Sequence, residues 1–179
     1  MRLLSLAVAA LPIVAAAAAY TAPPMMLKAA QQQGCNLPQG FQVRDFAGHA
    51  NGTDDAPAPS FFTFAYADNS TSVETSCQLN ATSTSTTPEG LTPRFACENR
   101  DVKFIWTPSN KQLTLVERAC RSPQGTPLYE ASGTIIISAP CKGGSCTANA
   151  TEYHGVFSSL QPVRDPTSYK MAYEMMEIE

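Results

Sequence analysis

The sequence predicts an all-β protein: a single compact antiparallel β-barrel or sandwich of about eight short strands, stapled by disulfides. Segments rich in aromatic and β-branched residues recur at near-regular spacing between clusters of Pro, Gly, Ser and Asn. This pattern is typical of short strands joined by turns. The chain also carries an apolar N-terminus and six cysteines beyond it. Together these features indicate a small β domain that folds where thiols oxidise.

The N-terminus, residues 1–19, has the organisation of a secretory signal peptide. Arg2 supplies the positive charge, residues 3–14 are apolar, and a run of alanines provides the small side chains of a cleavage site. An uncleaved membrane anchor is the weaker alternative, because no second hydrophobic run follows. We predict cleavage after Ala19, a flexible leader over 20–34, and a secreted, extracellular protein that makes no membrane contact.

The first two predicted strands are 41–46 and 60–67. Because side chains alternate along a strand, Phe41, Val43 and Asp45 are expected to share one face of the first. The second strand alternates larger aromatic side chains against its other residues, and one face carries Phe62, Phe64 and Tyr66. These alternating faces predict which side chains enter the core.

The middle of the chain contains a long polar segment between two short strand candidates, 72–78 and 94–98. Residues 80–93, NATSTSTTPEGLTP, have no apolar period and are predicted to form an exposed loop. Its Thr and Ser run is also a candidate for O-linked sugars.

Three strands, 102–106, 112–119 and 128–138, are predicted to form an antiparallel meander. Turn-forming residues separate them: TPSNK between the first two and RSPQGTP between the second pair. A last strand is expected over 152–160, and no helix before the last dozen residues. The domain then spans 35–163, and 164–179 is an acidic, Met-rich tail, mobile or a short helix.

Six cysteines in a secreted chain indicate a disulfide framework. Cys77 and Cys97 end short strands around the polar loop and could face each other, and glycines between Cys141 and Cys146 permit that small loop to close. Cys35 and Cys120 remain, and the sequence does not fix their pairing. A zinc site is the alternative, but no second pair repeats the Cys141–Cys146 spacing. We predict no metal and no cofactor.

Four Asn-x-Ser/Thr sequons lie in predicted loops or strand ends, where a glycan would project into water. The candidate glycosylation sites are Asn51, Asn69, Asn80 and Asn149.

A catalytic set is not recognisable in the sequence, and we predict that the protein is not an enzyme. No Gly-x-Ser-x-Gly motif occurs. His49 is expected in a solvated loop, His154 as a partly buried structural residue, and Asp54 with Asp55 in a hydrated turn. Oxidised cysteines provide no thiolate. The net charge of −3, with dispersed cations, argues against nucleic-acid binding.

The order of these segments over about residues 35–163 resembles a known fungal family. FQVRDF, SFFTFAYA and the loop between Cys77 and Cys97 are followed by VKFIW, QLTLVE, a strand bearing Gly133 and the Gly-rich Cys141–Cys146 loop. This is similar to the Alternaria major-allergen (Alt a one)-like family of secreted cysteine-rich β-barrels.

The resemblance implies a β-barrel without a known catalytic site, with disulfides Cys77–Cys97 and Cys141–Cys146. Family members act as allergens, or as effectors recognised by plant hosts, and some bind host defence proteins or dimerise. Two departures stand out: the last cysteine loop is shorter here than in the family, and Cys120 has no obvious counterpart.

The sequence therefore predicts a secreted, non-enzymatic fungal protein that is allergen-like or effector-like. We expect it to present loops to a partner, which is a protein of a host or of the cell wall. A monomer or weak homodimer is expected. One alternative is a barrel that binds a small apolar ligand, with SFFTFAYA lining it. A secreted hydrolase is the less favoured alternative.

Overall fold

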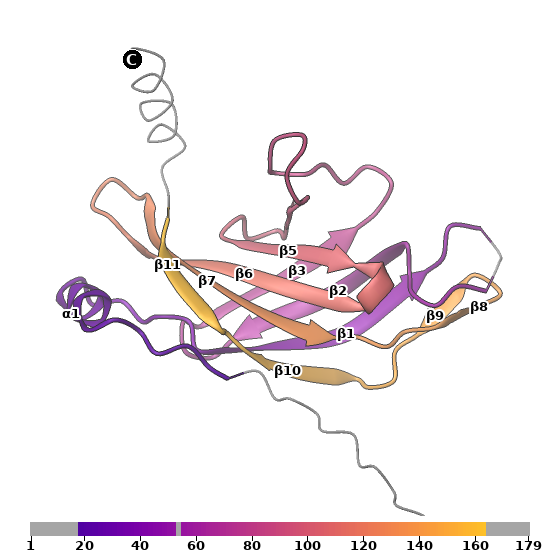
Figure 1. Cartoon of the computed structure of the whole chain (residues 1–179), viewed down its shortest axis with the longest axis horizontal. Coiled ribbons are helices and arrows are strands. Elements are labelled where there is room, and N and C mark those ends of the chain that lie inside the picture. The colour runs from indigo at the N-terminus through magenta and orange to yellow at the C-terminus, as the bar shows by residue number, and fades with distance from the viewer. Residues whose placement is uncertain (1–17, 53–54, 164–179) are drawn as a thin grey trace, which may run out of the picture.

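The computed structural model describes residues 18–52 and 55–163. The predicted all-β class is confirmed: two antiparallel sheets pack on each other as a sandwich (Figure 1). In the described part of the chain no strand pairing joins one sheet to the other, so the sheets do not close into the barrel that the resemblance implied. Residues 18–52 and 55–163 contain eleven strands rather than about eight, because several pieces of two to four residues also pair.

Sheet A has six strands, and its three longest lie next to one another. Its order is β3 (Val73–Leu79), β2 (Phe61–Asp68), β1 (Gly40–His49), β9 (Ser145–Thr147) and β8 (Cys141–Lys142), with β10 (Glu152–Val156) also paired to β1.

Sheet B contains the predicted meander, which is confirmed. Its order is β11 (Ser159–Pro162), β7 (Pro127–Ile136), β6 (Gln112–Arg121), β5 (Val102–Thr107) and β4 (Phe95–Ala96). A 3₁₀ turn over Pro108–Asn110, followed by Lys111 at a positive φ of 56°, connects β5 to β6. The segment 80–93, predicted as an exposed loop, forms no strand or helix and lies at the surface.

The core lies between the sheets and is dominated by aromatic rings. Phe62 and Phe64 of β2 pack against Phe104 of β5 with ring centroids 5.7 and 5.4 Å apart. Phe62, Phe64 and Tyr66 are all at most 3% exposed, which confirms the alternation predicted for this strand. Because these rings fill the space between the sheets with one another, their burial is that of an ordinary packed core.

The predicted strand 152–160 is two strands rather than one, because the chain changes sheets within it. β10 pairs with β1 in sheet A, whereas β11 pairs with β7 in sheet B. The change occurs at Phe157, whose side chain is fully buried and packs on Phe41 with ring centroids 5.0 Å apart. One side chain thus occupies the corner between the two sheets.

The prediction that Asp45 shares one face of its strand with Phe41 and Val43 is also wrong. Phe41 and Val43 are buried, but Asp45 is exposed at a positive φ of 54°, and Phe46 takes the next buried position. β1 pairs with β10 before this point and with β9 after it, and its register with β2 shifts between Arg44 and Ala47. The extra residue of this β-bulge reverses the alternation.

The prediction of no helix before the last dozen residues is wrong. The segment 20–34, predicted as a leader, contains α1 (Pro24–Gln32), which lies at one end of the sandwich (Figure 1). Proline occupies its first turn, where a missing N–H is tolerated. Ala30 packs in a buried cluster with Leu37, Cys120 and Tyr129. A helix of nine residues is marginal alone, so this packing stabilises it.

Gly133 of β7 is a site where a single methyl group has a large predicted effect. A Cβ there would lie 2.3 Å from the Val156 carbonyl oxygen and 2.8 Å from Phe41 Cε1. Because the nearer atom belongs to the backbone of a strand, we expect Gly133→Ala to lower the free energy of unfolding by about 3 kcal/mol. Urea unfolding measures this loss of stability. The control is Thr134→Ser, at the exposed next position, which should change the free energy of unfolding by less than about 0.5 kcal/mol. Equal effects would contradict the prediction.

Candidate functional site

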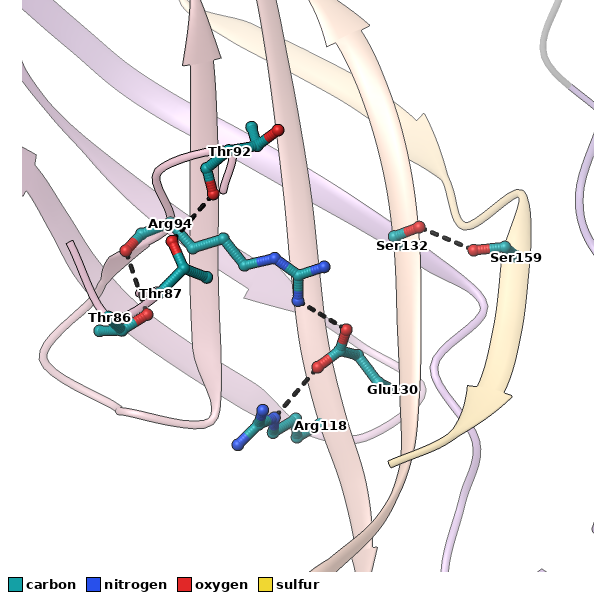
Figure 2. A network of polar contacts seen from close by, with 8 residues as sticks. All are labelled: Thr86, Thr87, Thr92, Arg94, Arg118, Glu130, Ser132 and Ser159. Carbon is teal, nitrogen blue, oxygen red and sulfur yellow. Dashed lines mark hydrogen bonds and ion pairs between the residues drawn. The ribbon is translucent and has the colours of Figure 1, made fainter. Parts of the chain in front are cut away.

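The outer face of sheet B carries an ion-pair network that reaches the polar loop 80–93. Glu130, on β7, is only 7% exposed. Its Oε1 accepts a hydrogen bond from Arg94 Nη1 at 2.7 Å, and its Oε2 accepts one from Arg118 Nε at 3.1 Å. Figure 2 shows the Arg94 side chain extending over the sheet to reach this carboxylate. Both Glu130 oxygens are therefore engaged, and charge-assisted pairs of this kind are the stronger hydrogen bonds in proteins.

Arg94 also holds the loop through its backbone. Its carbonyl oxygen accepts hydrogen bonds from the Thr86 N–H at 2.7 Å and from the Thr86 hydroxyl at 3.0 Å. The Thr87 hydroxyl donates to the Thr92 carbonyl at 2.9 Å, which closes the turn of the loop on itself (Figure 2). A segment without apolar anchors is thus fixed on the sheet by one arginine.

A groove of about 600 Å³ opens between this loop and sheet B. Hydroxyl and amide side chains of β3 and the loop line it on one side, and charged side chains of the sheet and the turn before β5 line it on the other. The lining residues with side-chain hydrogen-bonding or charged groups are Gln78, Asn80, Thr82, Ser83, Thr84, Thr86, Arg100, Asp101, Lys103 and Arg118.

Burial and neighbouring charges shift the pKa values of two groups on this face. Burial, and then the positive charge of Arg118, lower the pKa of Lys103 below its usual value. The pKa of Glu130 is also lowered: burial alone would raise it, but the hydrogen bonds from Arg94 and Arg118 outweigh that effect. Burial is thus the main cause of the lowered pKa of Lys103, and the two arginines hold Glu130 ionised.

The six cysteines form three disulfides, Cys35–Cys120, Cys77–Cys97 and Cys141–Cys146, which confirms the predicted framework. Cys77 lies on β3 of sheet A and Cys97 directly follows β4 of sheet B, so this bond joins the two sheets beside the polar loop. Cys141–Cys146 closes the β8–β9 hairpin at the other end of the sandwich from α1 (Figure 1).

All four sequon asparagines lie outside the strands. Asn51, Asn69 and Asn149 are exposed, whereas Asn80 is half-buried at the groove. Asn80 Oδ1 accepts hydrogen bonds from the N–H of Thr82 at 2.9 Å and from the Thr82 hydroxyl at 2.8 Å. The asparagines are thus placed where glycans could project, and the one at Asn80 would stand at the groove.

The two histidines lie on different strands, and the structure describes one of the paired aspartates, Asp55. His49 is exposed at the end of β1, not in a loop, and its ring lies 5.2 Å from that of Phe61. His154 is exposed on β10, with Nε2 3.2 Å from Glu152 Oε1, so the predicted partial burial is wrong. Asp55 accepts a hydrogen bond from Gly143 N–H at 2.9 Å, and Asp54 lies outside the described residues.

A second polar cluster is buried between the sheets. The Glu117 carboxylate, on β6, accepts hydrogen bonds from the Tyr66 hydroxyl and, at 2.7 Å, from the Thr71 hydroxyl. Burial raises the pKa of Glu117 to about 7, although both hydrogen bonds oppose the rise. Burial, and then the Glu117 charge, raise the pKa of Tyr66 above its ordinary range. Glu117 and Glu130 lie on opposite faces of sheet B, since the side chains of Leu113, Leu115 and Glu117 all point into the core.

Sequence reasoning missed the network on the outer face. Arg94 and Glu130 are 36 residues apart, and no local pattern connects them. A signal did exist for Glu117, because alternation places it on the same face as Leu113 and Leu115, where a polar side chain is unexpected.

Comparison with models of known families, with curated proteins and with solved structures found no match to this chain. In the described part, no helix is both long and apolar enough to span a bilayer. Residues 18–52 and 55–163 also contain no group of three or more His, Cys, Asp or Glu side chains placed to hold a metal ion.

Proposed function

We propose that this chain is a secreted, non-enzymatic fungal protein, allergen-like or effector-like, that presents the loop 80–93 and the adjoining groove to a host or cell-wall partner. The observation that carries the proposal is the Arg94–Glu130–Arg118 network, which fixes a polar loop in one shape over a cationic face. The fungal origin and the allergen-like or effector-like role rest on the resemblance in segment order.

A fixed loop favours recognition for an energetic reason. Ordering a flexible loop on binding costs conformational entropy, which reduces affinity. Here the loop is ordered before any partner arrives, by the Arg94 side chain and by backbone hydrogen bonds from Thr86 to Arg94. Such preorganisation is expected where an exposed polar segment serves as a recognition surface.

Export from the cell is supported by two independent features. The apolar N-terminus has the organisation of a signal peptide. Three disulfides are rare in reducing compartments and are stable outside the cell. All six cysteines are consumed within the chain, so a dimer would have to form through non-covalent contacts. We propose a monomer or weak homodimer.

The proposal predicts that Arg94→Ala lowers binding to the partner while leaving the fold intact. Purified protein is incubated with plant leaf extract and, separately, with insoluble wall material, and the retained fraction is quantified. We expect at least about a tenfold weaker retention for Arg94→Ala, because the loop loses its anchor to Glu130. Protease cleavage within 80–93 should become faster.

The matched control is Arg44→Ala. Arg44 also forms an ion pair, 3.6 Å from Glu74, but on sheet A and at the surface, so its loss should change neither retention nor cleavage. Absence of wild-type retention by both materials, or equal retention by Arg94→Ala, would overturn the proposed function.

A further inference from the structure

We propose that the groove beside the loop binds an anionic polysaccharide, a chain of sugar rings that carry carboxylate groups. This inference rests on the proposed function and specifies the chemistry of its partner. Three properties of the groove carry it: its charge, the hydrogen-bonding groups of its walls, and its shape.

The charge of the groove is opposite to that of the whole chain. The chain has a formal net charge of −3, yet the groove is lined by Arg100, Lys103 and Arg118 against a single acidic residue, Asp101. Asp101 is already paired with Arg121, and Arg118 with Glu130. Among the described residues, Arg100 and Lys103 form no ion pair, so both cations are available to a ligand. A local cationic site on an acidic protein selects anions.

The walls of the groove are suited to sugar hydroxyls. Six of its side chains carry hydroxyl or amide groups: Gln78, Asn80, Thr82, Ser83, Thr84 and Thr86. The hydroxyls of Thr82 and Ser83 already donate to Asn80 Oδ1, and that of Thr86 donates to the Arg94 carbonyl, which leaves these three oxygens as acceptors. Gln78, Thr84 and the amide nitrogen of Asn80 supply donors. Phe95 also borders the groove, but its ring packs on Phe104 of the core, with ring centroids 5.7 Å apart. A groove with many hydrogen-bond donors and acceptors suits a sugar, which carries a hydroxyl on most of its carbon atoms.

The composition of the groove favours a saccharide over an acidic peptide. Peptide and protein partners are anchored by large apolar or aromatic side chains that enter apolar pockets. The apolar lining here is limited to Phe95, Ala96 and Pro127. With a volume of about 600 Å³ and an open form, the groove has room for several sugar units of a linear chain rather than for one enclosed small molecule.

The test measures binding of oligogalacturonate by isothermal titration calorimetry to the full mature protein, produced in a host that does not add N-glycans, so that Asn80 carries no sugar. We expect the double variant Arg100→Gln/Lys103→Gln to raise the Kd by at least about tenfold, because charge-assisted hydrogen bonds are lost. Raising the salt concentration to about 1 M should weaken wild-type binding, since the Debye length falls to about 3 Å.

The control double variant is Lys28→Gln/Lys142→Gln. It removes the same charge from two exposed positions, on α1 and β8, away from the groove lining, and should bind as the wild type does. Thermal unfolding of both double variants should match the wild type. Equal weakening by the two double variants would overturn the proposal, as would the absence of oligogalacturonate binding.

Two further probes define the ligand class. A neutral glucan oligomer should bind at least about tenfold more weakly than oligogalacturonate, because it offers no carboxylate to the cations. Polyglutamate should also bind more weakly, and binding as tight as that of oligogalacturonate would overturn the saccharide assignment. If wall material or leaf extract is retained through Arg94 while oligogalacturonate is not bound, the inference fails and the proposed function stands.

Discussion

Replacement of both Cys35 and Cys120 by alanine is expected to lower the free energy of unfolding by about 4–5 kcal/mol. This disulfide joins residues 85 positions apart, and the loss of chain entropy in the unfolded state grows with the length of the closed loop. The bond also attaches the segment that carries α1 to β6, where Cys120 is buried beside Tyr129. Denaturant unfolding measures the change, and hydrogen exchange of the amides of residues 24–32 should become faster.

The matched control is the Cys141→Ala/Cys146→Ala variant. That disulfide closes only five positions, so its removal should cost about 2 kcal/mol and leave exchange in α1 unchanged. Equal losses in the two variants, or unchanged exchange of α1 without Cys35–Cys120, would show that the long loop does not contribute as argued.

Stability is expected to fall by about 3 kcal/mol between pH 4.5 and 7 because of Glu117 alone. Its pKa rises from 4.5 in the unfolded chain to about 7 in the folded protein. Below pH 4.5 the carboxyl is protonated in both states, and its contribution is then fully present. As the pH rises towards 7, the unfolded chain releases the proton first, so unfolding becomes easier, and above the folded pKa the loss is complete.

Glu117→Gln should remove this pH dependence. Gln resembles the protonated carboxyl, with one acceptor and one donor group for Tyr66 and Thr71, and cannot ionise. In urea unfolding from pH 4.5 to 8, the free energy of unfolding of the variant should therefore increase relative to that of the wild type as the pH rises. Glu98→Gln, at an exposed position, is the control and should run parallel to the wild type. Parallel curves for Glu117→Gln would contradict the assigned burial effect.

The two buried glutamates respond to pH in opposite directions. The pKa of Glu130 is lowered by Arg94 and Arg118, so its contribution is present above the ordinary carboxyl pKa and is lost as the pH falls through the lowered value. Its window lies below that of Glu117, so Glu130 does not contribute to the change expected between pH 4.5 and 7.

Strand faces were predictable where each strand keeps one set of partners. The alternation of Phe62, Phe64 and Tyr66 in β2 is confirmed because β2 pairs without interruption with β3. The predicted alternation of faces failed at Asp45, where the neighbour of β1 changes from β10 to β9 and a β-bulge adds one residue to β1. It failed again at Phe157, where the chain leaves one sheet for the other. Both failures depend on residues far away in the sequence.

The candidate site was predictable only in part. The absence of apolar residues in 80–93 identified an exposed loop, because such a segment cannot enter a core. The groove depends on Arg94 reaching Glu130 across β5 and β6, and that contact exists only once the meander has formed. No sequence pattern distinguishes Arg100 and Lys103 from other surface cations. They became candidate ligand-binding residues only when the structure placed them in one groove with hydroxyl-bearing side chains.

The sequence by itself determined the β class, the meander, the exposed loop and the oxidised cysteines, because period-two patterning, turn residues and thiol chemistry act over short stretches of chain. Tertiary structure alone decided the packing of α1, the bulge at Asp45, the raised pKa of Glu117 and the ion pairs of Glu130. Burial and charge at these residues are set by neighbours from other strands, and their approach depends on how the two sheets pack.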